Sequence, residues 1–271
     1  MTVQESVPTS RPTGPVPVRD SGHDRSQRAG HATATSPLLA VCGLCGGAGT
    51  STLSYLVARY AVAQAAGHVL VCDTGGPNGG LAAGAGVQSP RSLREVAARV
   101  AQGLPLPGGI YAVDEPAGTS EHQLRMIATD PRLDDAGDTD GLNALLAMAR
   151  SDGAHALTVV DCGTLQTEAD RLVLRSASHV AWVLPATSNG VRRAEHGLAA
   201  LEFGLAGREL VVARRDRHKC AVGLEALRAL AERRRAPLVL LPDLGEPLDR
   251  PVRALEEAQV ALQAILGALQ R

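Results

Sequence analysis

Short apolar runs alternate with longer amphipathic segments from Leu38 to the end of the chain. The runs are rich in Val and Leu at successive positions, which is typical of strands buried on both faces of a parallel sheet. The predicted strands are 38–42, 68–73, 123–128, 156–161, 179–184, 209–213 and 237–241, and helix-length segments lie at 51–66, 142–150, 191–203, 224–235 and 253–269. This alternation predicts an α/β fold: a single doubly wound, mostly parallel sheet flanked by helices.

The first 36 residues lack this pattern. They are rich in Pro, Ser, Thr, Gly, His and Arg, and such a segment cannot bury enough apolar surface to offset the entropy lost on ordering. We therefore expect residues 1–36 to be a disordered tail and residues 37–271 to form one domain. The sequence contains no secretory signal pattern and no uninterrupted apolar stretch of roughly 18 residues, so we expect a cytoplasmic protein without a transmembrane segment.

Composition changes this picture in two respects. The chain of 271 residues is 45% hydrophobic but contains only one Trp, three Tyr and one Phe, so its core must be built from Ala, Val and Leu. Lys219 is the only lysine among 27 basic residues, which excludes any mechanism that needs a lysine at another position. The formal net charge of −1 gives the whole chain no tendency to bind nucleic acid or a membrane.

A glycine-rich loop follows the first predicted strand directly and leads into the first predicted helix, in the order Cys42-Gly-Leu-Cys-Gly-Gly-Ala-Gly-Thr-Ser-Thr52. Glycines allow backbone N–H groups to converge on a ligand, and the helix N-terminus behind them adds positive partial charge. The Ser51 hydroxyl is placed to ligate Mg²⁺ between phosphates. The sequence predicts a phosphate site here; the alternative is a tight strand-to-helix turn without a ligand.

The loop resembles the deviant Walker A motif of the ParA/MinD family of P-loop ATPases, Lys-Gly-Gly-x-Gly-Lys-Ser/Thr. The two lysines of that motif fall on Cys45 and Thr50, and a preceding glycine falls on Leu44. This form is most similar to the CpaE/TadZ and septum-site-determining-protein branch, in which loss of the loop lysine is familiar. The positions that match the motif are Gly46, Gly47, Gly49, Ser51 and Thr52.

Further matches follow in the same order over residues 37–270. Asp73, at the end of the second predicted strand, matches the family's first switch aspartate, and Asp161 matches the Walker B carboxylate that holds Mg²⁺ through water. A second switch aspartate is replaced by Gly75. Residues 211–214 lie where the family often has an asparagine that contacts adenine, here replaced by alanine, and residues 240–243 resemble the adenine-side loop.

The resemblance implies ATP and Mg²⁺ as cofactors. Phosphoryl transfer depends on positive charge around the γ-phosphate, and the loss of one such donor costs on the order of 10²–10³ in rate. Because both lysines are missing, the sequence does not favour efficient hydrolysis. The implied nucleotide-binding residues are Gly46, Gly47, Ala48, Gly49, Thr50, Ser51 and Thr52, the implied Mg²⁺ site is Ser51 with Asp161, and the candidate catalytic residues are Asp73 and Asp161.

Two functions remain open at this point. The resemblance implies a degenerate, CpaE/TadZ-like pseudo-ATPase that positions or assembles a pilus, secretion or division apparatus, with weak or absent ATP turnover. The alternative is an active slow ATPase with an ATP-dependent monomer–dimer cycle. Both imply a homodimer with protein partners in the cytoplasm, and any contact with a membrane would be peripheral, through those partners.

The cysteines offer a competing interpretation. Cys42 and Cys45 form a C-x-x-C sequence at a strand-to-helix junction, and Cys72 and Cys162 end predicted strands, so a redox or metal-binding site is a further alternative. The glycines after Cys45 fit phosphate binding better.

Two surface features also need an interpretation. An arginine cluster permits non-specific DNA binding, although an ordinary basic face is the favoured interpretation. An apolar stripe in the last predicted helix indicates packing on the sheet rather than a membrane-targeting helix. The arginine cluster comprises Arg192, Arg193, Arg214, Arg215, Arg217, Lys219, Arg233, Arg234 and Arg235, and the stripe comprises Leu255, Leu262, Ile265, Leu266 and Leu269.

Overall fold

The computed structural model describes residues 35–64, 67–74, 80–81, 93–104, 111–112, 124–127, 139–151, 155–201, 205–215, 221–245 and 251–270. All but the last two residues of the expected tail lie outside these ranges, as do Gly75 and, from the predicted arginine cluster, Arg217 and Lys219. Ser36 is attached to the domain, because its hydroxyl donates to the His155 carbonyl at 2.6 Å and its N–H donates to the Arg150 carbonyl at 3.0 Å.

In this part of the chain, eight strands form one sheet in the order β3-β4-β2-β5-β1-β6-β7-β8. Neighbouring strands are parallel except for β3, which pairs with β4 in the antiparallel direction. The predicted doubly wound, mostly parallel sheet is confirmed. The strands are β1 (Leu38–Gly43), β2 (His68–Asp73), β3 (Tyr111–Ala112), β4 (Leu124–Ile127), β5 (His155–Asp161), β6 (His179–Pro185), β7 (Glu209–Arg214) and β8 (Leu238–Leu241).

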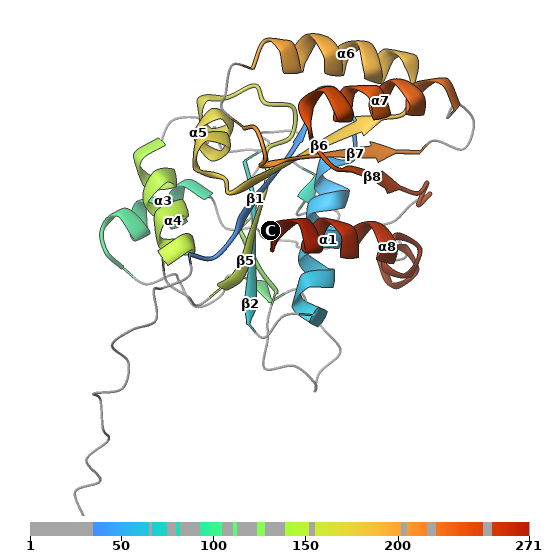
Figure 1. The fold of residues 1–271 in the computed structure, drawn as a ribbon. Helices are drawn as coiled ribbons and strands as arrows, with labels where there is room; N and C mark the ends of the chain where they lie inside the picture. The colour runs from blue at the N-terminus through green and yellow to red at the C-terminus, as the bar shows by residue number, and fades with distance from the viewer. Residues whose placement is uncertain are drawn as a thin grey trace, which may run out of the picture. The chain divides into compact units, whose positions relative to one another are not determined.

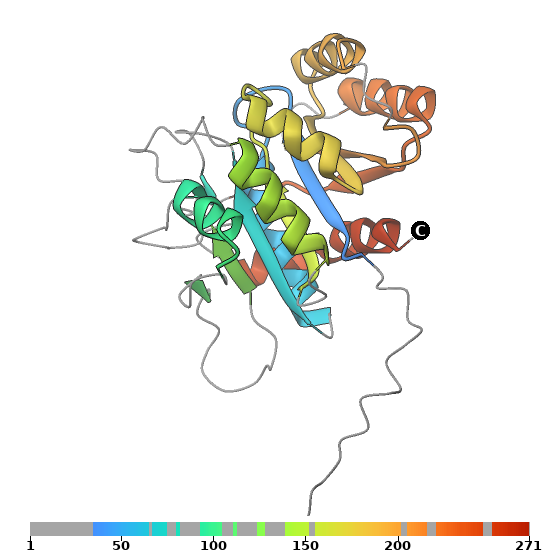
Figure 2. The ribbon, with the colours of Figure 1, turned by 90° about the vertical axis from the view of Figure 1, so that its left-hand side faces the viewer.

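Helices cover both faces of the sheet (Figures 1 and 2). The helices α1 (Thr50–Gln64) and α8 (Pro251–Leu269) pack together on one face. Residues of β1 alternate between the two layers: Leu39 and Val41 join the cluster under α1 and α8, and Leu38 and Ala40 join the opposite cluster. The opposite face is covered by α3 (Leu93–Ala101), α4 (Thr139–Ser151), α5 (Glu168–Ser176), α6 (Ser188–Ala199) and α7 (Ala221–Arg234).

The apolar stripe of α8 packs on the sheet side of the helix, as its spacing predicts. Leu262 and Ile265 are fully buried in the cluster that also contains Val239 of β8 and Leu53 of α1. None of the described helices combines the length and the apolar character that a membrane crossing requires.

The predicted arginine cluster is divided in the structure. The Arg234 guanidinium lies 2.7 Å from Glu209 Oε1, and the Trp182 indole N–H donates to the same oxygen at 2.8 Å. The Glu209 side chain is only 4% exposed, so this ion pair belongs to the core. Arg233 forms an exposed pair with Glu195 at 3.0 Å. Both arginines are engaged in ion pairs within the domain, which leaves fewer of them for a nucleic-acid surface.

We expect Arg234→Ala to lower the free energy of unfolding by about 2–4 kcal/mol, because it leaves the buried Glu209 carboxylate without its cation. Arg233→Ala is the matched control, since the side chains of its ion pair with Glu195 are 58% and 51% exposed. It should change the free energy by less than about 0.5 kcal/mol. Urea unfolding of both variants measures the difference, and equal losses would contradict a structural role for the buried pair.

Candidate functional site

The glycine-rich loop joins β1 to α1 at the carboxyl edge of the sheet. Because β1 lies between β5 and β6, the loop emerges beside the ends of both strands. The Gly43 N–H donates to the Gly163 carbonyl at 2.8 Å, which ties the base of the loop to the chain after β5. The Leu53 N–H donates to the Gly49 carbonyl at 2.9 Å, so the first helical hydrogen bond forms directly behind the loop.

The backbone conformation requires glycine at two loop positions. Gly47 has a φ of 69° and Gly49 a φ of 98°, in the left-handed region that residues with a Cβ rarely adopt. Gly46 and Gly47 are exposed, and no atom lies within 4 Å of the position that a Cβ would take on either residue. The tip of the loop is therefore open to a ligand along its backbone.

The residues that follow the loop tip are partly buried. Ala48 and Thr50 are buried and pack beside Gly43: a Cβ there would lie 3.0 Å from Ala48 Cβ and 3.1 Å from Thr50 Cγ2. Ser51 is half-buried in the first turn of α1. Gly80, in the chain after β2, approaches it, since a Cβ on Gly80 would lie 3.6 Å from the Ser51 hydroxyl oxygen. Only Ser51 among these side chains is therefore both polar and accessible.

Asp161, the last residue of β5, is fully buried. Its Oδ1 accepts a hydrogen bond from the Gly163 N–H at 3.1 Å, whereas its Oδ2 makes no hydrogen bond within the described residues. Burial raises the pKa of Asp161, and the nearby hydroxyls of Ser51 and Thr50 act in the opposite direction. A buried carboxylate oxygen without a partner, next to a serine hydroxyl, is the kind of oxygen donor set that Mg²⁺ prefers. These residues fit the metal ion that the resemblance implies.

A second group of polar residues joins the ends of β2 and β5. Asp73 is buried and lies opposite Asp161 in the pairing of these strands. The Thr74 N–H and hydroxyl donate to the Asp161 carbonyl at 2.8 and 3.0 Å, and the hydroxyl also lies 3.3 Å from Asp170 Oδ1. Sequence reasoning missed Thr74 and Asp170. The capping box of Thr167 and Asp170 at the start of α5 was the available signal.

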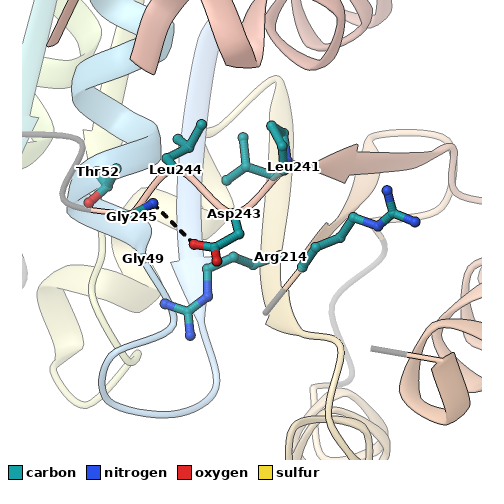
Figure 3. A pocket seen from close by; sticks show the side chains of 9 residues that line it. Gly49, Thr52, Arg214, Leu241, Asp243, Leu244 and Gly245 are labelled. Atoms are coloured by element: carbon teal, nitrogen blue, oxygen red, sulfur yellow. Dashed lines mark hydrogen bonds between the residues drawn. The ribbon is translucent and has the colours of Figure 1, made fainter. Parts of the chain in front are cut away.

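A cavity of about 230 Å³ lies beside the loop (Figure 3). Arg214, at the end of β7, extends to the loop, where its Nη1 donates to the Gly47 carbonyl at 2.6 Å. Sequence reasoning placed Arg214 in the basic cluster and missed this contact. The cavity brings Gly49 of the loop together with the end of β7 and the chain after β8. It is lined by Gly49, Thr52, Arg214, Arg215, Leu241, Pro242, Asp243, Leu244 and Gly245.

On its other side the loop is anchored to α6. Leu44, which replaces a glycine of the resembled motif, packs against Gly197, where a Cβ would lie 3.2 Å from the leucine methyl carbons. An open depression of about 540 Å³ adjoins this contact, lined by Leu44, Thr164, Arg192, Arg193, His196 and Gly197. The loop is thus held by apolar packing on one side and by Arg214 on the other.

Cys72 and Cys162 lack the properties of reactive thiols. Burial raises the pKa of Cys72 to about 12 and the pKa of Cys162 well above its ordinary value. A redox or metal-binding cysteine needs the opposite shift, since the thiolate is the reactive form. The described residues also contain no group of three or more His, Cys, Asp or Glu that could hold a metal ion. The described residues therefore give no support to the redox or metal alternative.

Solved structures with the same fold are ATPases and related proteins. The ParA family ATPase from Chlorobium tepidum aligns with a TM-score of 0.64 over 84% of this chain and 93% of its own, at 15% identity. The MinC:MinD cell division protein complex from Aquifex aeolicus gives a TM-score of 0.61 over 87% and 95%, at 17% identity. Cobyrinic acid a,c-diamide synthase from Mycobacterium smegmatis gives 0.59 over 86% and 95%, at 19% identity.

The chain has the ParA/MinD-type fold that the loop motif implies. No model of a protein family and no curated protein matches the sequence. Identities of this size carry the fold alone, so the function has to be argued from the site.

The raised pKa of Asp161 leads to a pH-dependent prediction. When burial raises the pKa of a carboxyl group, its ionised form costs stability above the folded-state pKa, and the cost disappears as the pH falls through the carboxyl range. We expect Asp161→Asn to raise the free energy of unfolding at pH 8 by on the order of 1 kcal/mol, because asparagine keeps an acceptor for the Gly163 N–H and carries no charge. The gain should vanish in acid.

Denaturant unfolding between pH 4 and pH 8 measures this difference. Glu225→Gln is the control, because the Glu225 side chain is 74% exposed. A loss of stability in Asp161→Asn at pH 8 would contradict the view that the ionised carboxylate lacks a compensating partner.

Proposed function

We propose that this protein is a degenerate ParA/MinD-like, CpaE/TadZ-like positioning or assembly factor that binds ATP with Mg²⁺ and hydrolyses it weakly or not at all. The observation that carries the proposal is Asp161, whose buried Oδ2 has no hydrogen-bond partner among the described residues and lies beside the glycine loop. Two proteins with this fold support it: MinD from Pyrococcus horikoshii is complexed with Mg-ADP, and the cobyrinic acid synthase contains an ATP analog and magnesium.

In this proposal the loop holds the phosphates mainly through backbone N–H groups. Ser51 contributes its hydroxyl to Mg²⁺, and Asp161 holds the ion through water. The ion, when bound, offsets phosphate charge that the loop side chains cannot offset. The proposed nucleotide-binding residues are Gly46, Gly47, Ala48, Gly49, Thr50, Ser51 and Thr52.

Weak turnover follows from the side chains that replace the two lysines. Cys45 carries no positive charge, and Thr50 is buried beside Gly43. Each missing donor costs on the order of 10²–10³ in rate, because the transition state of phosphoryl transfer develops charge that the protein must stabilise. Asp73 and Asp161 remain as candidate catalytic carboxylates, but the charge around a γ-phosphate is reduced.

A protein of this kind acts through assembly. The proposed active form is a homodimer joined at the nucleotide edge, and its partners belong to a pilus, secretion or division apparatus. The fold occurs in the MinC:MinD cell division complex, which supports a protein partner in general. Any membrane contact would come through these partners.

The alternative is an active slow ATPase with an ATP-dependent monomer–dimer cycle. The retained Asp73 and Asp161, at paired positions of β2 and β5, favour it. The two functions differ in one measurable property, which is hydrolysis that depends on Asp161.

We expect phosphate release by the wild type to equal that of Asp161→Ala within error, because the missing cations limit turnover. Thr50→Lys, which returns a cation to the loop, should raise the rate by about 10-fold or more, and the double variant with Asp161→Ala should lose this gain. Release of phosphate from ATP over hours, with purified full-length protein, measures all four. Wild-type turnover that Asp161→Ala abolishes, together with ATP-dependent dimers in sedimentation, would instead establish the slow ATPase.

A further inference from the structure

Arg214 lies against the glycine loop although 167 residues separate it from its hydrogen-bond partner. Its Nη1 donates to the Gly47 carbonyl at 2.6 Å, and its Cδ lies 3.4 Å from the position that a Cβ would take on Gly49. The side chain therefore runs along the loop from the end of β7, and Figure 3 shows the guanidinium directed to the loop from across the cavity. Gly49 leaves the room for this approach.

The position of this cation is informative because α1 begins at Thr50, directly after Gly49. A helix N-terminus carries positive partial charge, so a cation beside it is unfavourable unless an anion lies between them. Hydrogen bonding to a loop carbonyl compensates part of that cost. A guanidinium has five N–H donors, and the bond to Gly47 uses one. An anion that accepts hydrogen bonds from both the loop N–H groups and the guanidinium removes the remaining electrostatic cost.

We propose that Arg214 is the cation of the phosphate site and supplies, from β7, the charge that lysines supply within the resembled loop motif. This inference rests on the proposed nucleotide binding and adds the residue that makes such binding possible without a lysine. Arginine suits the role because its planar fork binds phosphate oxygens in pairs.

The cavity indicates the chemical class of the ligand. Arg214 and Arg215 give it two cations against one carboxylate, Asp243, which accepts a hydrogen bond from the Gly245 N–H at 3.0 Å. Leu241 and Leu244 line it as well. A nucleoside polyphosphate has this character, with an anionic chain at one end and a flat, weakly polar base at the other. Arg214 contacts the chain, so its effect should follow the number of phosphates and not the base.

The test compares Arg214→Gln, Arg214→Lys and a control, Arg228→Gln, in the full-length protein. The control removes the same charge from the exposed face of α7, where Arg228 pairs only with Glu225 among the described residues. The probes are Mg·ATP, inorganic tripolyphosphate and adenosine, with dissociation constants from calorimetry. Thermal unfolding of each variant without ligand shows whether the fold is retained.

We expect Arg214→Gln to weaken Mg·ATP and tripolyphosphate binding by roughly 10–100-fold, the effect of losing a hydrogen bond to a charged group. Adenosine binding should not change, Arg214→Lys should retain part of the affinity, and Arg228→Gln should match the wild type. Equal Mg·ATP affinity in Arg214→Gln and Arg228→Gln would overturn the role of Arg214 and leave nucleotide binding intact.

Two other results are also decisive. Tighter Mg·ATP binding by Arg214→Gln would mean that the arginine blocks the loop, which overturns the inference while nucleotide binding stands. A wild type that binds neither Mg·ATP nor tripolyphosphate would overturn both the inference and the proposed function.

Discussion

A carboxylate inside a protein core stays ionised only where hydrogen-bond donors or cations surround it. Asp161, at the edge of the sheet, is subject to this requirement. Parallel strands end at one edge, which brings Asp161 together with the end of β2, the start of α1 and the glycine loop. The Gly163 N–H donates a hydrogen bond to one oxygen of the Asp161 carboxylate, whereas the other oxygen has no hydrogen bond within the described residues. Because this second oxygen lacks a donor or cation, we favour a metal–nucleotide site over a tight strand-to-helix turn without a ligand.

The fold itself does not decide between functions. A ParA family ATPase, a MinC:MinD cell division protein complex and a cobyrinic acid a,c-diamide synthase share it with this chain at 15–19% identity. In our proposal, the present site differs in the residue that supplies its positive charge. The loop offers backbone donors and hydroxyls but no lysine, and Arg214 reaches it from a different strand. Under the proposed function, such a site holds phosphate but stabilises poorly the charge that develops during transfer.

The sequence predicted those helices and strands that are marked by a run or a period of apolar residues within the element itself. The run at His68–Asp73 was placed at its correct bounds, because a strand buried on both faces is continuously apolar. The helices α3 and α5 were missed because each has only nine residues, which is shorter than the window over which a helical period is recognised. β3, with two residues in an antiparallel edge pair, gives no pattern at all. The contact of Arg214 with Gly47 depends on strand order, and no local signal carries strand order.

In our proposal, Mg²⁺ and the loop together hold a nucleotide through Asp161. The most direct test is a calorimetric titration of the full-length protein with ATP, first with Mg²⁺ and then with EDTA, repeated with Asp161→Asn. We expect binding of ATP by the wild type to weaken by about 10-fold or more without Mg²⁺, and Asp161→Asn should show no such dependence on the ion. Equal ATP affinity of the wild type with and without Mg²⁺, or no ATP binding at millimolar concentration, would contradict it.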